Sequence, residues 1–231
     1  MDRNIFRLLG DIFIHPATLW RYREFYGSYR YFLQSIGGRI VRAFYKPTLP
    51  HNVGDKIYLH LGCGDVNHPQ FINIDVIPAP HIHYVRSIDN LSIFKNSSVD
   101  LIYASHCLEH FPMRAIDSVL KEWHRVLRPD GILRLSVPDF DTLLKIYLEN
   151  DNDITPILGA LMGGQTYFHN YHKILFTEKS LALLLTTAGF NTVRLWIPQS
   201  SELTTFDDWS SRPITVNGKE CRVSLNIEAV K

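Results

Sequence analysis

The sequence predicts an α/β fold, in which a seven-stranded, mostly parallel sheet carries helices on both faces and follows an N-terminal helical extension. Short apolar runs alternate along the chain with segments of helical periodicity, which is the pattern of a parallel sheet. The chain has 231 residues, of which 45% are hydrophobic and 20% charged, as in an ordinary globular protein. The pattern of apolar and polar residues changes after a proline-containing linker that ends at Pro50. We therefore expect an extension at residues 1–50 and a main domain at residues 51–231.

The extension is basic and rich in aromatic residues. It holds 8 Lys and Arg against 3 Asp and Glu, a balance of +5, whereas the remainder holds 16 against 20, a balance of −4. Breaks in its helices are expected at His15-Pro16, because proline disfavours helix in the residue before it, and at Gly37-Gly38. We expect the extension to pack on the domain and help to enclose a substrate. Weak contact with a membrane surface or a partner protein is the alternative.

Strands are expected at the short apolar runs, and the last of them is expected to be antiparallel: residues 57–61, 71–76, 82–85, 99–104, 132–137, 193–197 and 223–229. Helices are expected at residues 112–127, 139–149 and 177–188. In the first helix, apolar residues recur at helical spacing up to the turn signal Arg128-Pro129-Asp130-Gly131. Thr177 is a suitable N-cap for the last helix, and Gly189 ends it.

Charge and cysteine content restrict the partners and the compartment. The formal net charge of +1 gives no reason to expect nucleic-acid binding. The three cysteines, Cys63, Cys107 and Cys221, are widely spaced and form no CxxC pair, which favours a reducing compartment over a disulfide framework. No run of about 18 apolar residues occurs, and the first residues lack the pattern of a signal peptide. We expect a cytoplasmic protein.

Small and polar residues follow the predicted strands at the points where a ligand would bind. In open α/β sheets, ligands bind beyond the carboxyl ends of the strands. Gly62-Cys63-Gly64 follows the first strand, and glycine lets the backbone approach a ligand closely. Asp75 ends the second strand, where a carboxylate can accept hydrogen bonds from a ribose. Ser105-His106 follows the fourth strand, with Glu109-His110 one turn further on.

A nicotinamide dinucleotide or a nucleotide sugar is the rival ligand, and the spacing disfavours it. The third glycine of the dinucleotide fingerprint would fall at Asn67. Asp75 lies 13 positions after Gly62, whereas the fingerprint places its acidic residue roughly 20 residues on. About nine residues separate the two strands, which is too few for a crossover helix. A pyrophosphate would therefore lack the helix N-terminus that normally binds it.

Four stretches, taken in order, resemble class I S-adenosylmethionine-dependent methyltransferases, and the similarity is greatest to the type 11 subgroup. These stretches are His60–Gly64, Phe71–Asp75, Ser98–His110 and Glu122–Gly131, and the resemblance covers roughly residues 56–197. It implies a Rossmann-like fold and S-adenosylmethionine as the cofactor. It also implies the residues that contact the cofactor: Leu61, Gly62, Cys63, Gly64, Asp75, Val76, Ser87, Ile88, Asp89, Ser105 and His106.

The resemblance implies a role for each part of this set. The glycine loop would pass beneath the methionine moiety, and Asp75 would bind the ribose hydroxyls. Val76 and the loop Ser87–Asp89 would flank the adenine, while Ser105 and His106 would lie near the sulfonium. Two positions depart from the family, which usually has an acidic residue where His60 stands and often one where Ser87 stands. At the second of these positions, the neighbouring Asp89 would supply the carboxylate that Ser87 lacks.

Histidines are the candidate catalytic residues. The segment Gln165–Lys173 would face the substrate, and His106, His110 and His172 are each candidates for a general base if the acceptor is a hydroxyl. The alternative for each is a hydrogen-bonded structural histidine. His106 and His110 are four positions apart but lack the pattern of a zinc-protease helix, so we predict no metal. Cys63 is expected to be a small residue that fits the loop.

The sequence therefore predicts a methyltransferase that acts on a small molecule or a saccharide, with a sugar hydroxyl as the acceptor and surface polysaccharide synthesis as the context. The acceptor is suggested only by analogy with methyltransferases of similar appearance. The alternative is a member of the same fold that binds the cofactor, or serves as a scaffold, without catalysis. His60 and Ser87 motivate that alternative.

Overall fold

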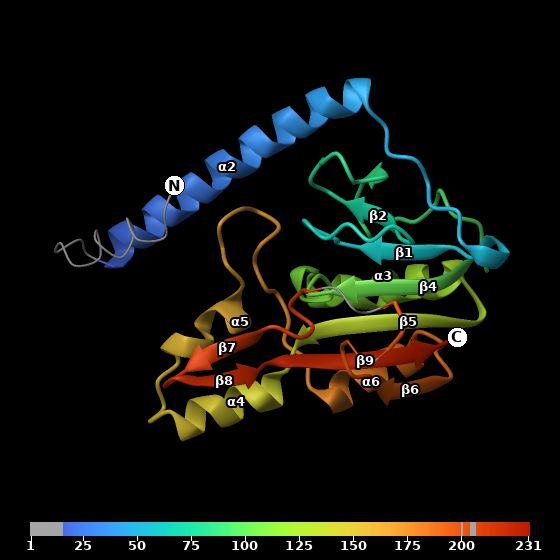
Figure 1. Ribbon diagram of the computed structural model, residues 1–231. Coiled ribbons are helices and arrows are strands. Elements are labelled where there is room, and N and C mark those ends of the chain that lie inside the picture. Colours follow the sequence, from blue (N-terminus) through green and yellow to red (C-terminus); the bar gives the residue numbers. More distant parts are fainter. Residues whose placement is uncertain (1–15, 200, 204–206) are drawn as a thin grey trace.

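The computed structural model describes residues 16–199, 201–203 and 207–231, with side chains from residue 25 onward. A seven-stranded sheet in the order β3-β2-β1-β4-β5-β9-β6 forms its centre (Figure 1). The strands are β1 (Tyr58–Leu61), β2 (Ile72–Asp75), β3 (Tyr84–Val85), β4 (Val99–Ser105), β5 (Leu127–Pro138), β6 (Thr192–Leu195) and β9 (Ser224–Val230).

The sheet is mostly parallel, as predicted. Neighbouring strands from β3 to β5 pair in parallel, whereas β9 is antiparallel both to β5 and to β6. Residues 62–71 join β1 to β2 without a helix, so the short first crossover is confirmed. The carboxyl ends of β1, β2 and β4 consequently meet at one edge of the sheet, where a ligand can reach all three.

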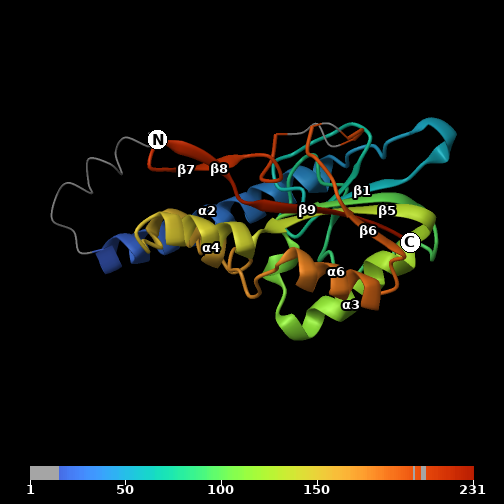
Figure 2. The same cartoon turned by 90° about the horizontal axis from the view of Figure 1, so that it is seen from below.

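Helices α3 (Met113–Val126) and α6 (Glu178–Thr187) pack together on one face of the sheet (Figure 2). The predicted boundaries of both helices agree with the structure to within one residue. Thr177 caps α6 through a reciprocal pair of hydrogen bonds with Ser180. Trp123 of α3 is fully buried, and its indole N–H donates to Ile88 O at 2.8 Å. This face holds the main hydrophobic core, in which the apolar side chains of the strands meet those of the two helices.

The opposite face of the sheet has a smaller core built from strands and loops. It contains Phe71, Tyr103 and Trp196, which are all buried. The Tyr103 hydroxyl donates to Asp208 Oδ2 at 2.6 Å. His60 is buried among these rings, with its centroid 5.1 Å from that of Tyr103. In the described part of the chain, the segment that follows β6 covers this face in place of a crossover helix.

The described part of the extension forms a long helix, α2 (Pro16–Phe44), which crosses the top of the molecule in Figure 1. Proline is favoured at a first helical position, and the expected break at His15-Pro16 falls at the limit of the described residues. The expected break at Gly37-Gly38 is wrong, because α2 continues through both glycines. At Gly38 a Cβ would lie 2.0 Å from Pro78 O. Glycine here permits close contact between helix and domain.

Helices α4 (Phe140–Glu149) and α5 (Leu158–Met162) and the hairpin of β7 (Pro213–Val216) and β8 (Lys219–Arg222) lie at one end of the sheet (Figure 1). Single 3-10 turns occur at Val53–Asp55, Leu108–His110 and Thr155–Ile157. The hairpin was not predicted, although its Asn217-Gly218 turn, with positive φ at both residues, is a strong hairpin signal. β5 begins at Leu127, five residues earlier than expected, and includes the predicted turn.

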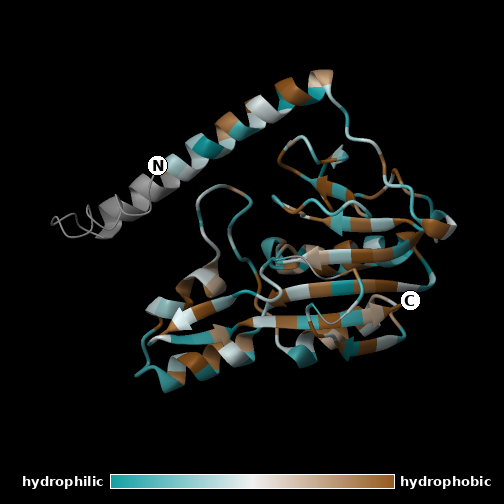
Figure 3. Ribbon diagram, in the orientation of Figure 1, coloured by the Kyte–Doolittle hydropathy of each residue, from teal (hydrophilic) through white to brown (hydrophobic). Residues whose placement is uncertain are grey.

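Hydropathy along the chain follows this layout. Figure 3 shows hydrophobic residues recurring along the strands of the sheet, whereas the coloured part of α2 mixes both kinds. Exposed apolar side chains on α2 include Phe25, Phe32 and Phe44. Among the residues that the structure describes, no helix combines the length and the apolar character needed to cross a membrane.

Candidate functional site

The glycine loop and Asp75 lie against each other at the carboxyl edge of the sheet. The Gly64 N–H donates to Asp75 Oδ2 at 3.0 Å, and the Ile77 N–H donates to Asp75 Oδ1 at 2.8 Å. Asp75 is 7% exposed. Burial raises the pKa of Asp75, an effect that the hydrogen bonds from the backbone of Ile77 and Gly64 oppose. Each oxygen of the carboxylate keeps a free lone pair, so Asp75 can also accept hydrogen bonds from a diol.

The two glycines of the loop differ in their surroundings. Both have a positive φ, +64° at Gly62 and +53° at Gly64. A Cβ on Gly62 would lie 2.9 Å from the Cβ of Cys107, whereas a Cβ on Gly64 would meet nothing within 4 Å. Gly62 is therefore required by close packing at the end of β4. Gly64 borders open space, which a side chain would occupy and a ligand can use.

Leu61, which precedes the glycine loop, and Cys63, which lies within it, are both buried. Leu61 is fully buried in the core, and its carbonyl oxygen lies 3.6 Å from the Cys107 thiol. Burial, together with the carboxylate of Asp75, raises the pKa of the Cys63 thiol. A protonated, buried thiol is a poor nucleophile, which fits the expectation that Cys63 is present for its size.

The predicted adenine-binding residues take different positions. Val76 is half-buried directly after Asp75, whereas Ser87 and Asp89 are exposed in the loop after β3. Ile88 is buried in the main core beneath Trp123, so only its backbone can face a ligand. The loop is tied to the site because the Arg86 N–H donates to Asp75 O at 2.9 Å. The structure therefore brings Val76, Ser87 and Asp89 to the same edge, but it directs the Ile88 side chain away from it.

The loop after α5 covers this edge together with α2. Tyr167 of the loop stacks on Tyr31 of α2 with ring centroids 4.9 Å apart, and Figure 1 shows the loop rising toward the helix. Burial and then the charge of Asp75 raise the pKa of Tyr167 to about 12, so Tyr167 lies near the carboxylate. A cavity of about 270 Å³ opens between α2, Ile77 and Tyr167. Tyr167 belongs to the segment Gln165–Lys173, but the sequence reasoning had not singled it out.

The three candidate catalytic histidines gather around Glu109, a residue that the sequence reasoning had not selected. Glu109 is fully buried in the turn after β4. His106 Nδ1 lies 3.3 Å and His172 Nε2 lies 3.8 Å from Glu109 Oε1. The rings of His110 and His172 meet edge to face with centroids 4.9 Å apart. His106 has a positive φ of 51°, which turns the chain sharply at the end of β4.

The same histidines line a pocket at this end of the sheet. The pocket has a volume of about 360 Å³, and its walls include His106, His110, His172 and Trp209. His106 Nε2 lies 2.8 Å from Ser224 Oγ, so β9 fixes the ring on the far side. Ser105, which precedes His106, is half-buried at the end of β4. His106, one of the two predicted sulfonium-binding residues, therefore also lines the pocket.

The three histidines and Glu109 affect one another's ionisation. Burial opposes ionisation of Glu109, but the close approach and charge of His106, with the charges of His110 and His172, lower the pKa of Glu109 below its usual value. Burial lowers the pKa of His172, against the attraction of Glu109. Glu109 is therefore a carboxylate at neutral pH, enclosed by imidazoles.

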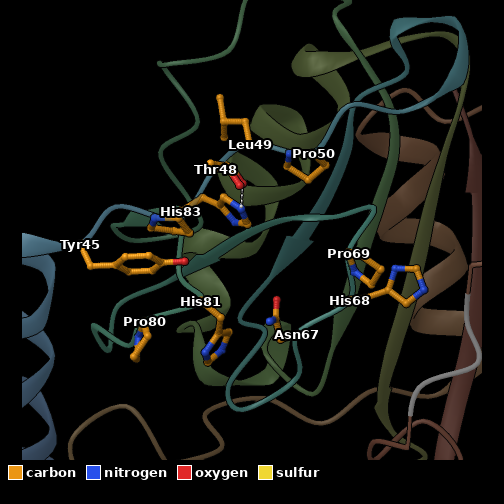
Figure 4. A pocket seen from close by; sticks show the side chains of 11 residues that line it. Tyr45, Thr48, Leu49, Pro50, Asn67, His68, Pro69, Pro80, His81 and His83 are labelled. Atoms are coloured by element: carbon orange, nitrogen blue, oxygen red, sulfur yellow. Dashed lines mark hydrogen bonds between the residues drawn. The ribbon is translucent and has the colours of Figure 1, made fainter.

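A third hollow, of about 360 Å³, lies between the linker that follows α2 and the loops on either side of β2. Figure 4 shows Tyr45, Asn67 and His81 around it, with a hydrogen bond of 3.0 Å between His83 Nε2 and Thr48 O. His81 Nε2 lies 2.8 Å from Gly64 O. This hollow shares no lining residue with the histidine pocket, and its contacts attach the linker to the glycine loop.

The fold is a mostly parallel α/β sheet, and the glycine loop and Asp75 lie at the edge where open sheets of this kind bind ligands. Residues 68–135 match the family described as "Methyltransferase domain", of type 11. The resemblance predicted from the sequence is thereby confirmed over these residues: this segment is similar to class I S-adenosylmethionine-dependent methyltransferases, and S-adenosylmethionine is the cofactor of that class.

Curated relatives match over a limited region. The ubiquinone/menaquinone biosynthesis C-methyltransferase UbiE of Vibrio vulnificus, in strains YJ016 and CMCP6, is 30% identical over 94 residues. That match covers 39% of this chain and 35% of the relative. The chain thus matches only about a third of the length of these relatives, and the acceptor of UbiE cannot be transferred to it.

Solved structures with a similar arrangement include methyltransferases from several organisms. A SAM-dependent methyltransferase from Archaeoglobus fulgidus is 15% identical, with a TM-score of 0.48 over 87% of this chain and 94% of that chain. The 1,6-didemethyltoxoflavin-N1-methyltransferase of Burkholderia thailandensis, solved with S-adenosylhomocysteine, is 18% identical, with a TM-score of 0.46 over 76% and 70%. At these identities and TM-scores, no site residue is transferred.

Proposed function

We propose that this protein binds S-adenosylmethionine at the glycine loop and Asp75, and transfers its methyl group to a hydroxyl oxygen of a small molecule or saccharide held in the histidine pocket. The observation that carries the proposal is the contact between Gly64 and Asp75 at the carboxyl edge of the sheet, where β4 also ends and is followed by His106 of the pocket. Both halves of the reaction would then lie at one edge of the sheet.

The residues present suit the cofactor. The carboxylate of Asp75, already oriented by two backbone N–H groups, keeps acceptor capacity for the two ribose hydroxyls. The open space beside Gly64 leaves room for the methionine moiety to pass close to the backbone. Tyr167 and α2 would shield the bound nucleoside from solvent. Val76, Ser87, the Ile88 backbone and Asp89 are the proposed adenine contacts.

The pocket residues would orient the acceptor. S-adenosylmethionine supplies a methyl group on a sulfonium, and transfer to oxygen is an in-line displacement whose rate depends strongly on alignment of the two reacting atoms. His106 lines the pocket and follows Ser105 at the end of β4, and in this proposal these two residues would fix that alignment. The acceptor hydroxyl must lose its proton, and His106, His110 and His172 are the groups in the pocket that can receive it.

The finer parts of the proposal rest on analogy. A saccharide acceptor, a place in surface polysaccharide synthesis and residence in the cytoplasm stay predictions from the sequence. The division into an extension at residues 1–50 and a domain at residues 51–231 also stays a proposal, supported by helix α2 and the linker after it.

A calorimetric titration with S-adenosylhomocysteine tests the cofactor site. Wild-type protein should bind it, and Asp75→Ala should bind it about 10- to 150-fold more weakly, because a charge-assisted hydrogen bond contributes roughly 1.5–3 kcal/mol. Asp65→Ala is the matched control, since Asp65 is an exposed carboxylate one residue beyond the glycine loop. Unchanged affinity in a folded Asp75→Ala protein would contradict the assignment of Asp75.

A second experiment tests methyl transfer. The protein is incubated with S-adenosylmethionine labelled in its methyl group and with fractionated cell extract, and the labelled product is identified. A labelled saccharide or other hydroxyl compound is the expected result. Cofactor binding without any labelled product would favour the alternative of a non-catalytic member, which His60 and Ser87, at positions usually acidic in the family, motivate.

A further inference from the structure

Glu109, His110 and His172 form a compact group of possible metal ligands. One side-chain atom from each lies within 4.8 Å of the corresponding atoms of the other two. Glu109 and His110 come from the turn after β4, whereas His172 comes from the loop that leads back to the sheet before α6. Contact between two distant segments creates the group.

Both histidines are oriented by backbone carbonyl groups. His110 Nδ1 lies 3.1 Å from Tyr171 O, and His172 Nδ1 lies 2.9 Å from Ala160 O. A neutral imidazole that donates from Nδ1 carries its lone pair on Nε2. Nε2 of His172 points toward Glu109, at 3.8 Å. Histidines that bind metals are oriented in this way, with the second ring nitrogen donating to a carbonyl or carboxylate.

The environment of the Glu109 side chain is a second observation that favours a bound cation. Its side chain is fully buried, and in the described part of the chain neither carboxylate oxygen has a hydrogen bond of good geometry. The nearest groups are the imidazoles of His106 and His172, at 3.3 and 3.8 Å. A buried carboxylate without well-aligned hydrogen bonds is costly, and a cation between its oxygen and the two Nε2 atoms would satisfy it.

We propose that Glu109, His110 and His172 bind a divalent transition-metal ion at the wall of the histidine pocket. Two imidazoles and one carboxylate suit Mn²⁺, Fe²⁺, Co²⁺ or Zn²⁺ better than Mg²⁺, which prefers oxygen ligands. Three protein ligands leave coordination positions open. His110 and His172 both line the pocket, so those positions face the space assigned to the acceptor.

The same chemistry indicates what the ion would do there. An oxygen donor, such as one or two hydroxyls of the acceptor, would complete the coordination and would be held at a fixed distance from the edge of the sheet. This part rests on the proposed function. With His110 and His172 bound to the ion, His106 is the candidate base that is left to receive the proton of the acceptor. Its ring, which lies between Glu109 and Ser224, also holds the carboxylate in place.

Metal binding is measured on the full chain after dialysis against a chelator. Titration with Co²⁺, followed by its visible absorption, and calorimetry with Mn²⁺ report stoichiometry and affinity without any methyl transfer. We expect one ion per chain and a rise in melting temperature with metal concentration. Glu109→Gln and His172→Gln should weaken binding at least about 10-fold. His169→Gln is the matched control, since His169 lies exposed in the same loop.

The outcomes separate the two proposals. One ion per chain in wild type and His169→Gln, with weaker binding in His172→Gln, supports the site; no stoichiometric uptake, or equal uptake by a folded His172→Gln protein, overturns it. Because Glu109 is buried, Glu109→Gln counts only if its circular dichroism matches wild type, and His172→Gln otherwise decides. Titration of the same samples with S-adenosylhomocysteine reports on the cofactor site alone, so binding of that ligand without metal uptake overturns only the metal site.

Discussion

Acidification should destabilise this protein through one buried histidine on the face of the sheet opposite α3. His60 is 2% exposed and lies edge to face with Tyr103. Burial lowers the pKa of His60 from 6.5 to about 3, against the attraction of Asp208. Above pH 6.5 the histidine is neutral in both the folded and the unfolded state. Below it, the unfolded chain takes up a proton that the folded chain refuses.

The magnitude follows from the difference between the two pKa values. Each pH unit below 6.5 lowers the free energy of unfolding by about 1.4 kcal/mol until the pKa of the folded state is reached. At about pH 5 the loss from this residue is therefore about 2 kcal/mol. Urea unfolding at about pH 8 and about pH 5 measures it, in wild type and in His60→Phe, which keeps an aromatic ring but removes the titrating group.

The comparison is made on the difference between the two proteins. Other titrating groups contribute equally to both, so the pH dependence of the wild type should exceed that of His60→Phe by about 2 kcal/mol over this interval. His51→Gln, which removes an exposed histidine, should leave the wild-type pH dependence unchanged. If His60→Phe loses as much stability on acidification as the wild type does, the reasoning is refuted.

Two further predictions concern the glycine loop and the cap of α6. Gly62→Ala and Gly64→Ala both place an alanine at a positive φ, but only at Gly62 would the new Cβ lie 2.9 Å from the Cβ of Cys107. Gly62→Ala should therefore lower the free energy of unfolding by roughly 1–3 kcal/mol more than Gly64→Ala does. Equal melting temperatures of the two variants would contradict this. Thr177→Ala removes the acceptor for the Ser180 N–H at 3.1 Å and should lower the free energy of unfolding by about 1 kcal/mol. Urea denaturation checks it, and an unchanged midpoint would show that the cap contributes nothing.

Much of the sheet could be predicted because its signals are local. Apolar runs followed by glycine or a carboxylate indicated the strands and the mostly parallel sheet that they form. The hairpin at Asn217-Gly218 was missed even though its turn signal is local, because its strands are short and only partly buried. The unbroken α2 was missed for another reason. The glycine pair in it serves contact with Pro78, a tertiary requirement that the local sequence does not display.

The site divides in the same way. The contact between Gly64 and Asp75 spans a short loop and follows from the strand order. The grouping of His106, His110 and His172 around Glu109 depends on where the loop after α5 returns to the sheet, and no periodicity in the sequence reports that. The direction of Ile88 was also beyond prediction, because it is decided by packing against Trp123 of α3.

The loop that covers the second face of the sheet has a consequence for biosynthesis. Tyr103 is bonded to Asp208, 105 positions later in the chain, and Trp196 packs on the same ring. During translation, β1 and β4 will leave the ribosome well before the segment that shields Tyr103 and His60 is made. Until then one side of the nascent sheet stays exposed to solvent and to contact with other polypeptide chains. Completion of the fold, and not only its final stability, therefore depends on the last third of the protein.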